Sequence, residues 1–364
     1  MKIKNNMFFL IALLLLWLMH TVTIFWFCQN TAGFSLNTWT KLLPLTLTVI
    51  YVLLFILAKK TNFWTLEEIL LIYLGSLFLA FCIAFILICF GLILKLFHLT
   101  LPFNLGIPAL CIWLAAVVLS LYTAAKAPTV KEISFETPVL TQDKKIAFIA
   151  DAHFGATVSK KRAENLVKIL NQQKPDLIVF AGDIFETNFK DSLPYGEIIA
   201  PVLPGKKFGV FGNHEYYQGL ESERASFKRA NINLLENRSE IFENINIIGI
   251  NDIKTAKITK QEFENILREE VKPSYFNLLL THTPLYFEEA SKYGIDLMLS
   301  GHTHKGQIFP FNYLVRMALP YIYGHFKKDN SNLFVTSGTF FWGPPMRLLT
   351  NNEIVIITLK GMKK

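Results

Sequence analysis

Cysteine is scarce in this sequence of 364 residues. Its four copies, Cys28, Cys82, Cys89 and Cys111, all lie in the first third of the chain. The remaining two thirds contain none, which excludes a disulfide framework as the means of holding that part together. The same absence excludes a zinc site built from thiolates.

Charged residues are also few, at 18% of the chain, whereas hydrophobic residues make up 52%. This composition is too apolar for a soluble enzyme of the same length, so part of the chain is predicted to lie in lipid. Most of the long uncharged segments reach the about 20 residues that span a bilayer. They predict four transmembrane helices within residues 1–126, at Met7–Phe27, Leu42–Ala58, Ile69–Leu94 and Leu105–Ala125.

The first of these segments has a competing interpretation as a cleaved signal peptide. Its apolar run is longer than the about 7–15 residues of a signal core, and no small-residue cleavage site follows closely. His20 lies inside this segment. An intramembrane histidine is a candidate proton relay, but the absence of an acidic partner in the spans favours a structural role.

The lysines around the spans predict the orientation of the chain. Lys41 and Lys95 fall on one side, and a larger group falls on the other, namely Lys2, Lys4, Lys59, Lys60, Lys126 and Lys131. The positive-inside rule places the richer side in the cytoplasm. We therefore expect a multi-pass protein of the cell inner membrane, with both termini and the domain after the spans in the cytoplasm.

The net charge of +8 shows no concentrated basic region. The first 125 residues carry six lysines and two glutamates, or +4, which leaves +4 for the rest of the chain. A nucleic-acid binder carries a clustered basic stripe, so no nucleic-acid partner is expected.

Short apolar runs in the second part of the chain repeatedly end in Asp, Asn or His, usually beside Gly. An α/β sheet presents ligands at the carboxyl ends of its strands, so these five strand ends are predicted to point at one site. The polar ends are Asp151-Ala152-His153, Gly182-Asp183, Gly212-Asn213-His214-Glu215, Thr281-His282 and Gly301-His302-Thr303-His304.

The side chains at these ends form a mixed set of carboxylates, an amide oxygen and imidazoles. Such a set favours borderline divalent ions such as Mn²⁺, Fe²⁺ or Zn²⁺. Seven candidates are too many for one tetrahedral site but suit two ions that share a carboxylate, which is a known arrangement for displacement at phosphorus. The candidate ligands are Asp151, His153, Asp183, Asn213, His282, His302 and His304.

In this order, the motifs resemble the calcineurin-like metallophosphoesterase superfamily over about Lys145–Leu359. The segments GNHEYY (Gly212–Tyr217) and FWGPPMR (Phe341–Arg347) further resemble a membrane-anchored bacterial subgroup. The resemblance implies an α/β fold in which two packed β-sheets are flanked by helices.

The resemblance also implies a role for each motif residue. Asp151, His153 and His304 would hold the first ion. Asp183 would bridge the two ions, and Asn213, His282 and His302 would hold the second. His214 would act outside the metal shell as a general acid.

Three residues need separate interpretation. Lys305 stands where the subgroup usually has Gly, and the acidic residue that the subgroup carries after Gly-Asp appears here as Glu186. Lys305 is either a substrate-phosphate ligand or a solvated loop lysine. Arg347 is either a bidentate ligand of an anionic substrate group or part of a structural salt bridge.

The predicted organisation is a membrane region at 1–126, a linker at 127–144 that contains Pro128 and Pro138, and a catalytic domain at 145–364. Aromatic residues are dense after the last histidine motif. They predict either the core of the second sheet or an apolar groove for a lipid tail. The aromatic set is Phe309, Phe311, Tyr313, Tyr321, Tyr323, Phe326, Phe340, Phe341 and Trp342.

Three functions follow as hypotheses. The first is a membrane-anchored dimetal phosphoesterase that acts on a lipid or lipid-precursor phosphoester, with membrane lipids and that substrate as its partners. The second is a tethered nuclease or cyclic-nucleotide phosphodiesterase. The third is a non-enzymatic metal-binding sensor. No protein partner is inferred.

Overall fold

The computed structural model describes residues 2–31, 38–101, 103–155, 157–186, 189–202 and 205–362. The chain forms two compact units. One comprises Met1–Tyr122 with Gly343–Met346, and the other comprises Thr123–Trp342 with Arg347–Lys364.

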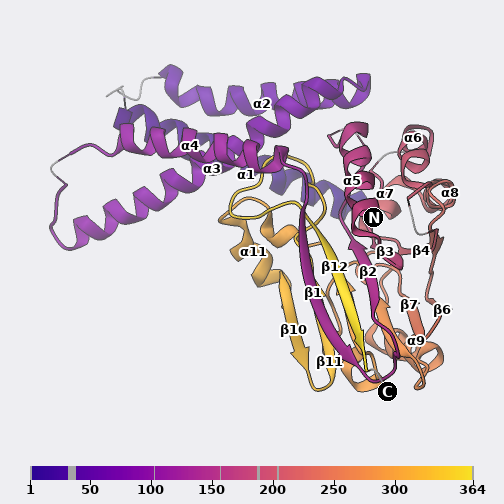
Figure 1. Cartoon of the computed structure of the whole chain (residues 1–364). Coiled ribbons are helices and arrows are strands. Elements are labelled where there is room, and N and C mark those ends of the chain that lie inside the picture. Colours follow the sequence, from indigo (N-terminus) through magenta and orange to yellow (C-terminus); the bar gives the residue numbers. More distant parts are fainter. Residues whose placement is uncertain are drawn as a thin grey trace. The chain divides into compact units, whose positions relative to one another are not determined.

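The first unit is built from helices α1 (Lys2–Thr31), α2 (Thr38–Thr61), α3 (Trp64–Leu96) and α4 (Gly106–Ala125) (Figure 1). All four are long and apolar enough to cross a membrane, which confirms the four apolar helices that the sequence predicted. Leu53 and Leu92 are more than 60% exposed, as expected of side chains that face lipid rather than a protein core.

His20 is fully buried among three of these helices. Its Nδ1 lies 2.9 Å from Oγ1 of Thr48 on α2, and its Nε2 lies 2.7 Å from the hydroxyl of Tyr73 on α3. Both ring nitrogens therefore have interhelical partners, which stabilise helix association in membranes. This geometry favours the structural role.

The second unit contains two six-stranded sheets. The first has the order β1 (Thr129–Thr137), β12 (Glu353–Gly361), β2 (Lys144–Ile149), β3 (Leu177–Ala181), β4 (Lys207–Val210) and β5 (Asn233–Leu234). The second has the order β10 (Gly324–Lys328), β11 (Ser331–Val335), β9 (Leu297–Ser300), β8 (Phe276–Leu280), β7 (Ile245–Gly249) and β6 (Arg238–Phe242).

Alternating side chains of these strands build the layers. Ile146 and Phe148 of β2 belong to a buried cluster with residues of the second sheet such as Leu280. Ala147 and Ile149 instead belong to a cluster with helices α5 (Lys160–Gln173), α6 (Phe189–Ile199) and α8 (Leu220–Arg229). Helices α9 (Lys260–Glu270) and α10 (Phe287–Ala290) pack against the second sheet in a third cluster. The predicted pair of sheets flanked by helices is confirmed.

The predicted linker at 127–144 is corrected by strand β1. Thr129–Thr137 pairs in parallel with β12 over nine residues, at the edge of the first sheet (Figure 1). Charged residues and flanking prolines are typical of an edge strand, because such a strand needs hydrogen bonds on one side only. The catalytic unit therefore begins almost directly after α4.

The aromatic set is divided among three surroundings, of which only packing on the second sheet was predicted. Phe340 and Phe341 are buried with the helices of the first sheet. Tyr321 and Phe326 pack against the second sheet's helical side. Several others are exposed, namely Phe311, Tyr313 and Trp342.

Glu223 is a buried carboxyl group on α8. Neither of its oxygens has a hydrogen-bond partner within the described part of the chain. Burial, with the nearby Glu215, raises the pKa of Glu223 to about 9. The folded chain thus holds this proton while the unfolded chain loses it, so Glu223 makes folding less favourable as pH rises from its ordinary pKa towards about 9.

We therefore expect Glu223→Gln to stabilise the protein at pH 8 by about 1–3 kcal/mol, because folding then no longer has to bind a proton that the unfolded chain has released. At pH 6 the gain should be smaller. Melting of the full chain in detergent at both pH values measures this, with the exposed Glu221→Gln on the same helix as control. An equal change at the two pH values would show that Glu223 does not titrate in this range.

Candidate metal centre

Parallel strands carry the candidate ligands to one region. The parallel strands β2, β3 and β4 lead to Asp151, Asp183 and Asn213, and the parallel strands β8 and β9 lead to His282 and to the loop His302–His304. The structure brings these strand ends together, as the distances below show.

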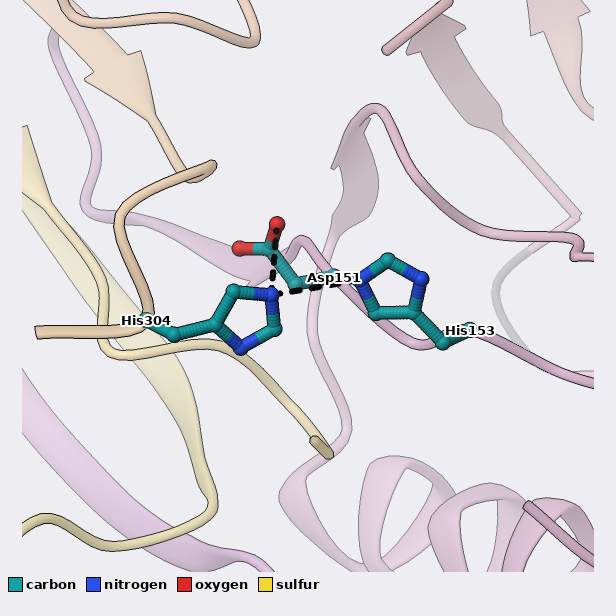
Figure 2. A group of neighbouring side chains, drawn as sticks. All are labelled: Asp151, His153 and His304. Atoms are coloured by element: carbon teal, nitrogen blue, oxygen red, sulfur yellow. Dashed lines mark hydrogen bonds and ion pairs between the residues drawn. The ribbon is translucent and has the colours of Figure 1, made fainter. Parts of the chain in front are cut away.

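Asp151, His153 and His304 form the first group, which Figure 2 shows. The Nε2 atoms of His153 and His304 are 3.2 Å apart, and Nε2 of His304 lies 3.6 Å from Oδ1 of Asp151. All three residues are buried. Two imidazole nitrogens and a carboxylate oxygen thus converge on one point.

Asp183, His282 and His302 form the second group. Nε2 of His282 lies 3.0 Å from Oδ2 of Asp183 and 3.2 Å from Nδ1 of His302. Nδ1 of His282 lies 2.8 Å from the carbonyl oxygen of Ala181. When Nδ1 donates to that carbonyl, the lone pair on Nε2 remains available to a metal.

Asp183 connects the two groups. Its Oδ2 also lies 3.9 Å from Nε2 of His153 in the first group. Burial favours the neutral acid, but the facing His282 and His214 hold the pKa of Asp183 well below its ordinary value. An ionised carboxylate between two sets of imidazoles is what a bridging ligand requires.

Asn213 begins the short helix α7 (Asn213–Gln218). Its Oδ1 is buried and has no hydrogen-bond partner among the residues that the structure describes. A buried oxygen without a partner is unfavourable, and a metal ion beside it would satisfy it. The donor set of this region therefore fits two divalent ions.

His214, the next residue along α7, faces the same region from outside both groups. Its Nδ1 lies 3.2 Å from Oε1 of Glu186, and its Nε2 lies 4.0 Å from Oδ2 of Asp183. Burial opposes the charged form, but these two carboxylates raise the pKa of His214 to about 9. Two bound dications would act in the opposite direction. The two carboxylates by themselves thus favour a protonated His214 near neutral pH.

The comparisons with known proteins agree with this geometry. A family model described as calcineurin-like phosphoesterase matches residues 144–306. A metallophosphoesterase of Campylobacter jejuni is 34% identical over 273 residues, which cover 73% of this chain and 71% of that protein. The chain belongs to the calcineurin-like metallophosphoesterase family.

Two further relatives extend the comparison. A metallophosphoesterase of Helicobacter pylori strain 26695 is 31% identical over 250 residues, which cover 65% of each chain. A "transmembrane protein with metallophosphoesterase domain" of Bos taurus is 29% identical over 281 residues, or 70% of this chain and 62% of that one. This chain is a metal-dependent phosphoesterase, and its own four apolar helices are long enough to cross a membrane.

Glu186 has a role in this metallophosphoesterase that the sequence did not assign. One of its oxygens contacts His214, and the other lies 3.0 Å from Nδ1 of His153. Nε1 of Trp342 also donates to it over 3.1 Å. Burial alone would raise the pKa of Glu186, but the two histidines, His153 first, lower it to about 2. Glu186 is therefore an anion that lies beside both rings.

Glu215 is a second residue whose role the sequence missed. Its fully buried carboxylate accepts hydrogen bonds from the backbone nitrogens of Gly212 (2.7 Å), Asp183 (3.0 Å) and Ile184 (2.7 Å). It thus ties the strand end at Asp183 to that at Asn213. An acidic residue in the first turn of a helix was the available signal, because such a residue accepts free backbone N–H groups.

Two glycines permit the close approach of these loops. A Cβ atom at Gly301 would overlap the carboxylate of Asp151, and one at Gly212 would overlap that of Asp183. The glycines in the predicted motifs are therefore needed for the metal groups to pack.

Arg347 does not occupy the position predicted for a substrate ligand. It is fully buried, and its guanidinium donates to the carbonyl of Ser337 over 2.8 Å and lies 3.4 Å from Nδ1 of His304. Arg347 also forms no ion pair with a carboxylate among the described residues, so the alternative of a structural salt bridge is not found. The predicted substrate contact is corrected: Arg347 supports the loop behind His304, because substrate cannot reach a side chain without exposed surface.

Proposed function

We propose that this metallophosphoesterase hydrolyses a phosphoester or pyrophosphate bond of a lipid or lipid precursor at the cytoplasmic surface of the inner membrane. The observation that carries the proposal is the short connection between the last apolar helix and the catalytic unit. Only residues 126–128 separate α4 from β1. Three extended residues reach at most about 10–11 Å.

The last residues of α4 belong to the second unit. The carbonyl oxygen of Ala124, a residue of the second unit, accepts from Arg162 over 3.0 Å and from Asn352 over 3.1 Å. A domain so attached to a membrane-spanning helix works at the bilayer surface. Lipid headgroups are the phosphoesters present there at high local concentration.

Helix α11 (Phe311–Ala318) supplies an apolar surface that suits this location. It follows the loop that carries His302 and His304, and no described residue on it is buried. Leu314 is 55% exposed and Met317 is 84% exposed. Apolar side chains on one short helix beside a site are typical of an interfacial segment that enters the headgroup region.

For the metal centre, we assign Asp151, His153 and His304 to one ion and Asn213, His282 and His302 to the other. Asp183 is assigned as the bridging ligand because it lies between both groups of histidines. Mn²⁺, Fe²⁺ and Zn²⁺ suit this mixture of donors. When bound, such a pair stabilises charge on the oxygens around phosphorus.

The protein's own groups then perform proton transfer. His214 gives its proton to the leaving oxygen, and Glu186 keeps the ring pointed at the reaction site. The lysine-rich loops support a cytoplasmic position of this unit.

The proposal is tested by comparing the full chain with a chain that begins at Thr123. Both are assayed with Mn²⁺ on a long-chain phospholipid in mixed micelles and on a short-chain soluble analogue. Single-stranded DNA and a cyclic nucleotide are added as substrates to test the hypothesis of a tethered nuclease or cyclic-nucleotide phosphodiesterase. We expect the full chain to prefer the micellar lipid, and the shorter chain to lose that preference. Equal efficiency of both chains on both substrates would refute the lipid assignment.

The surface of α11 gives a second expected result. Leu314→Glu combined with Met317→Glu should lower turnover of micellar lipid about tenfold, because charge is disfavoured in the apolar part of the interface. Hydrolysis of soluble p-nitrophenyl phosphate should not change. Ile241→Glu is the matched control. Ile241 is an exposed apolar residue (43%) on β6, and β6 forms the edge of the second sheet opposite β10, the strand that follows α11 in the chain.

A further inference from the structure

A pocket of about 210 Å³ lies beside the loop that carries His304, entirely within the second unit. Its polar lining includes Lys305, Asn312, Arg316 and Tyr323. Pockets for whole drug-sized molecules occupy roughly 300–1,000 Å³, so this one suits a single small group.

The pocket borders the loop that carries His302 and His304. Lys305 directly follows His304 in the 3₁₀ turn η2 (His304–Gly306). The hydroxyl of Thr303 donates to the carbonyl of Ile322, which lines the pocket, over 2.6 Å. The lining residue Thr350 likewise donates to the carbonyl of Gln307 over 2.8 Å. A group in this pocket therefore contacts the same loop that presents His302 and His304.

The pocket carries positive charge that no described acid neutralises. Neither Lys305 nor Arg316 forms an ion pair with a carboxylate in the described part of the chain. Nζ of Lys305 lies 4.4 Å from the centre of the Tyr323 ring. The nearby Glu353 already accepts from Tyr323 over 3.0 Å and from the backbone nitrogen of Ser337 over 2.9 Å. An anion would thus meet two available cations.

The backbone at Lys305 makes the presence of a lysine informative. Its φ of +54° and ψ of +26° lie in the left-handed region, which glycine adopts more readily. Lys305 thus presents a long cationic side chain to the pocket from a disfavoured backbone conformation directly after His304.

We infer that this pocket binds a second, non-scissile phosphate of the substrate while the scissile phosphate lies at the metal centre. The inference rests on the proposed function and narrows it to substrates with two anionic groups. Lys305 and Arg316 provide the charge, and Arg316 on α11 is the residue that selects for the second group. The amide of Asn312 provides a further polar contact, since Oδ1 is buried without a hydrogen-bond partner among the described residues and a flip exchanges it for the donor Nδ2.

The first arm of the test measures binding without turnover. Inorganic phosphate is titrated into the metal-free full chain in detergent, and the affinity is followed by calorimetry. We expect Lys305→Gly and Arg316→Glu each to weaken binding, the charge reversal by about tenfold. Lys305→Gly places the residue that best tolerates a left-handed backbone at this position, so the variant should fold. Lys328→Glu, on exposed β10, is the control and should bind as the wild type does.

The second arm measures selection between two short-chain lipids. Phosphatidic acid carries one phosphate, and phosphatidylglycerol phosphate carries a terminal and an internal phosphate. We expect Arg316→Glu to raise KM for the second lipid about tenfold and to leave its kcat, and the KM for phosphatidic acid, nearly unchanged.

The outcomes separate the two proposals. Wild-type affinity for phosphate in both pocket variants would overturn the subsite. Loss of phosphate binding with an unchanged KM for phosphatidylglycerol phosphate would show that a free anion, rather than a lipid headgroup, occupies the pocket, and would also overturn it. If the wild type hydrolyses neither lipid, the proposed function fails, and the binding arm still decides whether the anion site exists.

Discussion

Asp183→Asn is expected to abolish phosphoester hydrolysis and to lower metal occupancy at both positions. Its carboxylate lies between the imidazoles of the two groups, 3.0 Å from His282 and 3.9 Å from His153. The substitution keeps the shape of the side chain, and the amide oxygen can still accept from the backbone nitrogen of His214, as Oδ1 does now over 2.9 Å. The variant should therefore fold and lack only the negative charge.

The measurement is the metal content of the full chain after equilibration with Mn²⁺, together with hydrolysis of p-nitrophenyl phosphate. Asp329→Asn is the matched control, because Asp329 is exposed in the turn between β10 and β11. Two ions per chain at wild-type affinity in the Asp183 variant would refute the bridging assignment.

His214→Ala is expected to keep both ions and to lower kcat by about 10²–10⁴-fold, the usual contribution of a general acid. The loss should be larger for an alkyl phosphoester than for p-nitrophenyl phosphate, because an alkoxide leaving group needs the proton more. Loss of metal from this variant would instead identify His214 as a ligand.

Glu186→Gln tests the general-acid role of His214 independently, through the dependence of activity on pH. Glu186 helps to raise the pKa of His214 to about 9, so its neutral replacement should lower that pKa. A general acid works while protonated, and activity is lost as pH rises through its pKa. The variant's basic limb should therefore move to lower pH. An unmoved limb would show that His214 is not the group that titrates.

Local signals in the sequence were sufficient to predict the four apolar helices and the two-sheet fold, and they named candidate ligands that the structure brings together. The length of an apolar run predicts a membrane-spanning helix. A short apolar run that ends in Asp, Asn or His predicts both a buried strand and a candidate ligand, because both signals lie in a few neighbouring residues. The glycines at 212 and 301 strengthened these motifs, since the carboxylates of Asp183 and Asp151 occupy the space that a Cβ would need.

Other features depended on partners far away in the chain. Strand β1 forms because β12, more than 200 residues later, offers it a parallel edge. Glu186 lies beside two histidines from separate motifs, and Arg347 is buried behind a third.

Lys305 has both kinds of property, one that is local in the sequence and one that depends on the fold. The sequence by itself determined that a cation follows the last histidine. Only the tertiary structure decided that this cation lines a pocket with Arg316 and stands in a left-handed backbone conformation. Charge and residue type are local properties, whereas burial, orientation and strain arise from contacts that the folded chain alone brings together.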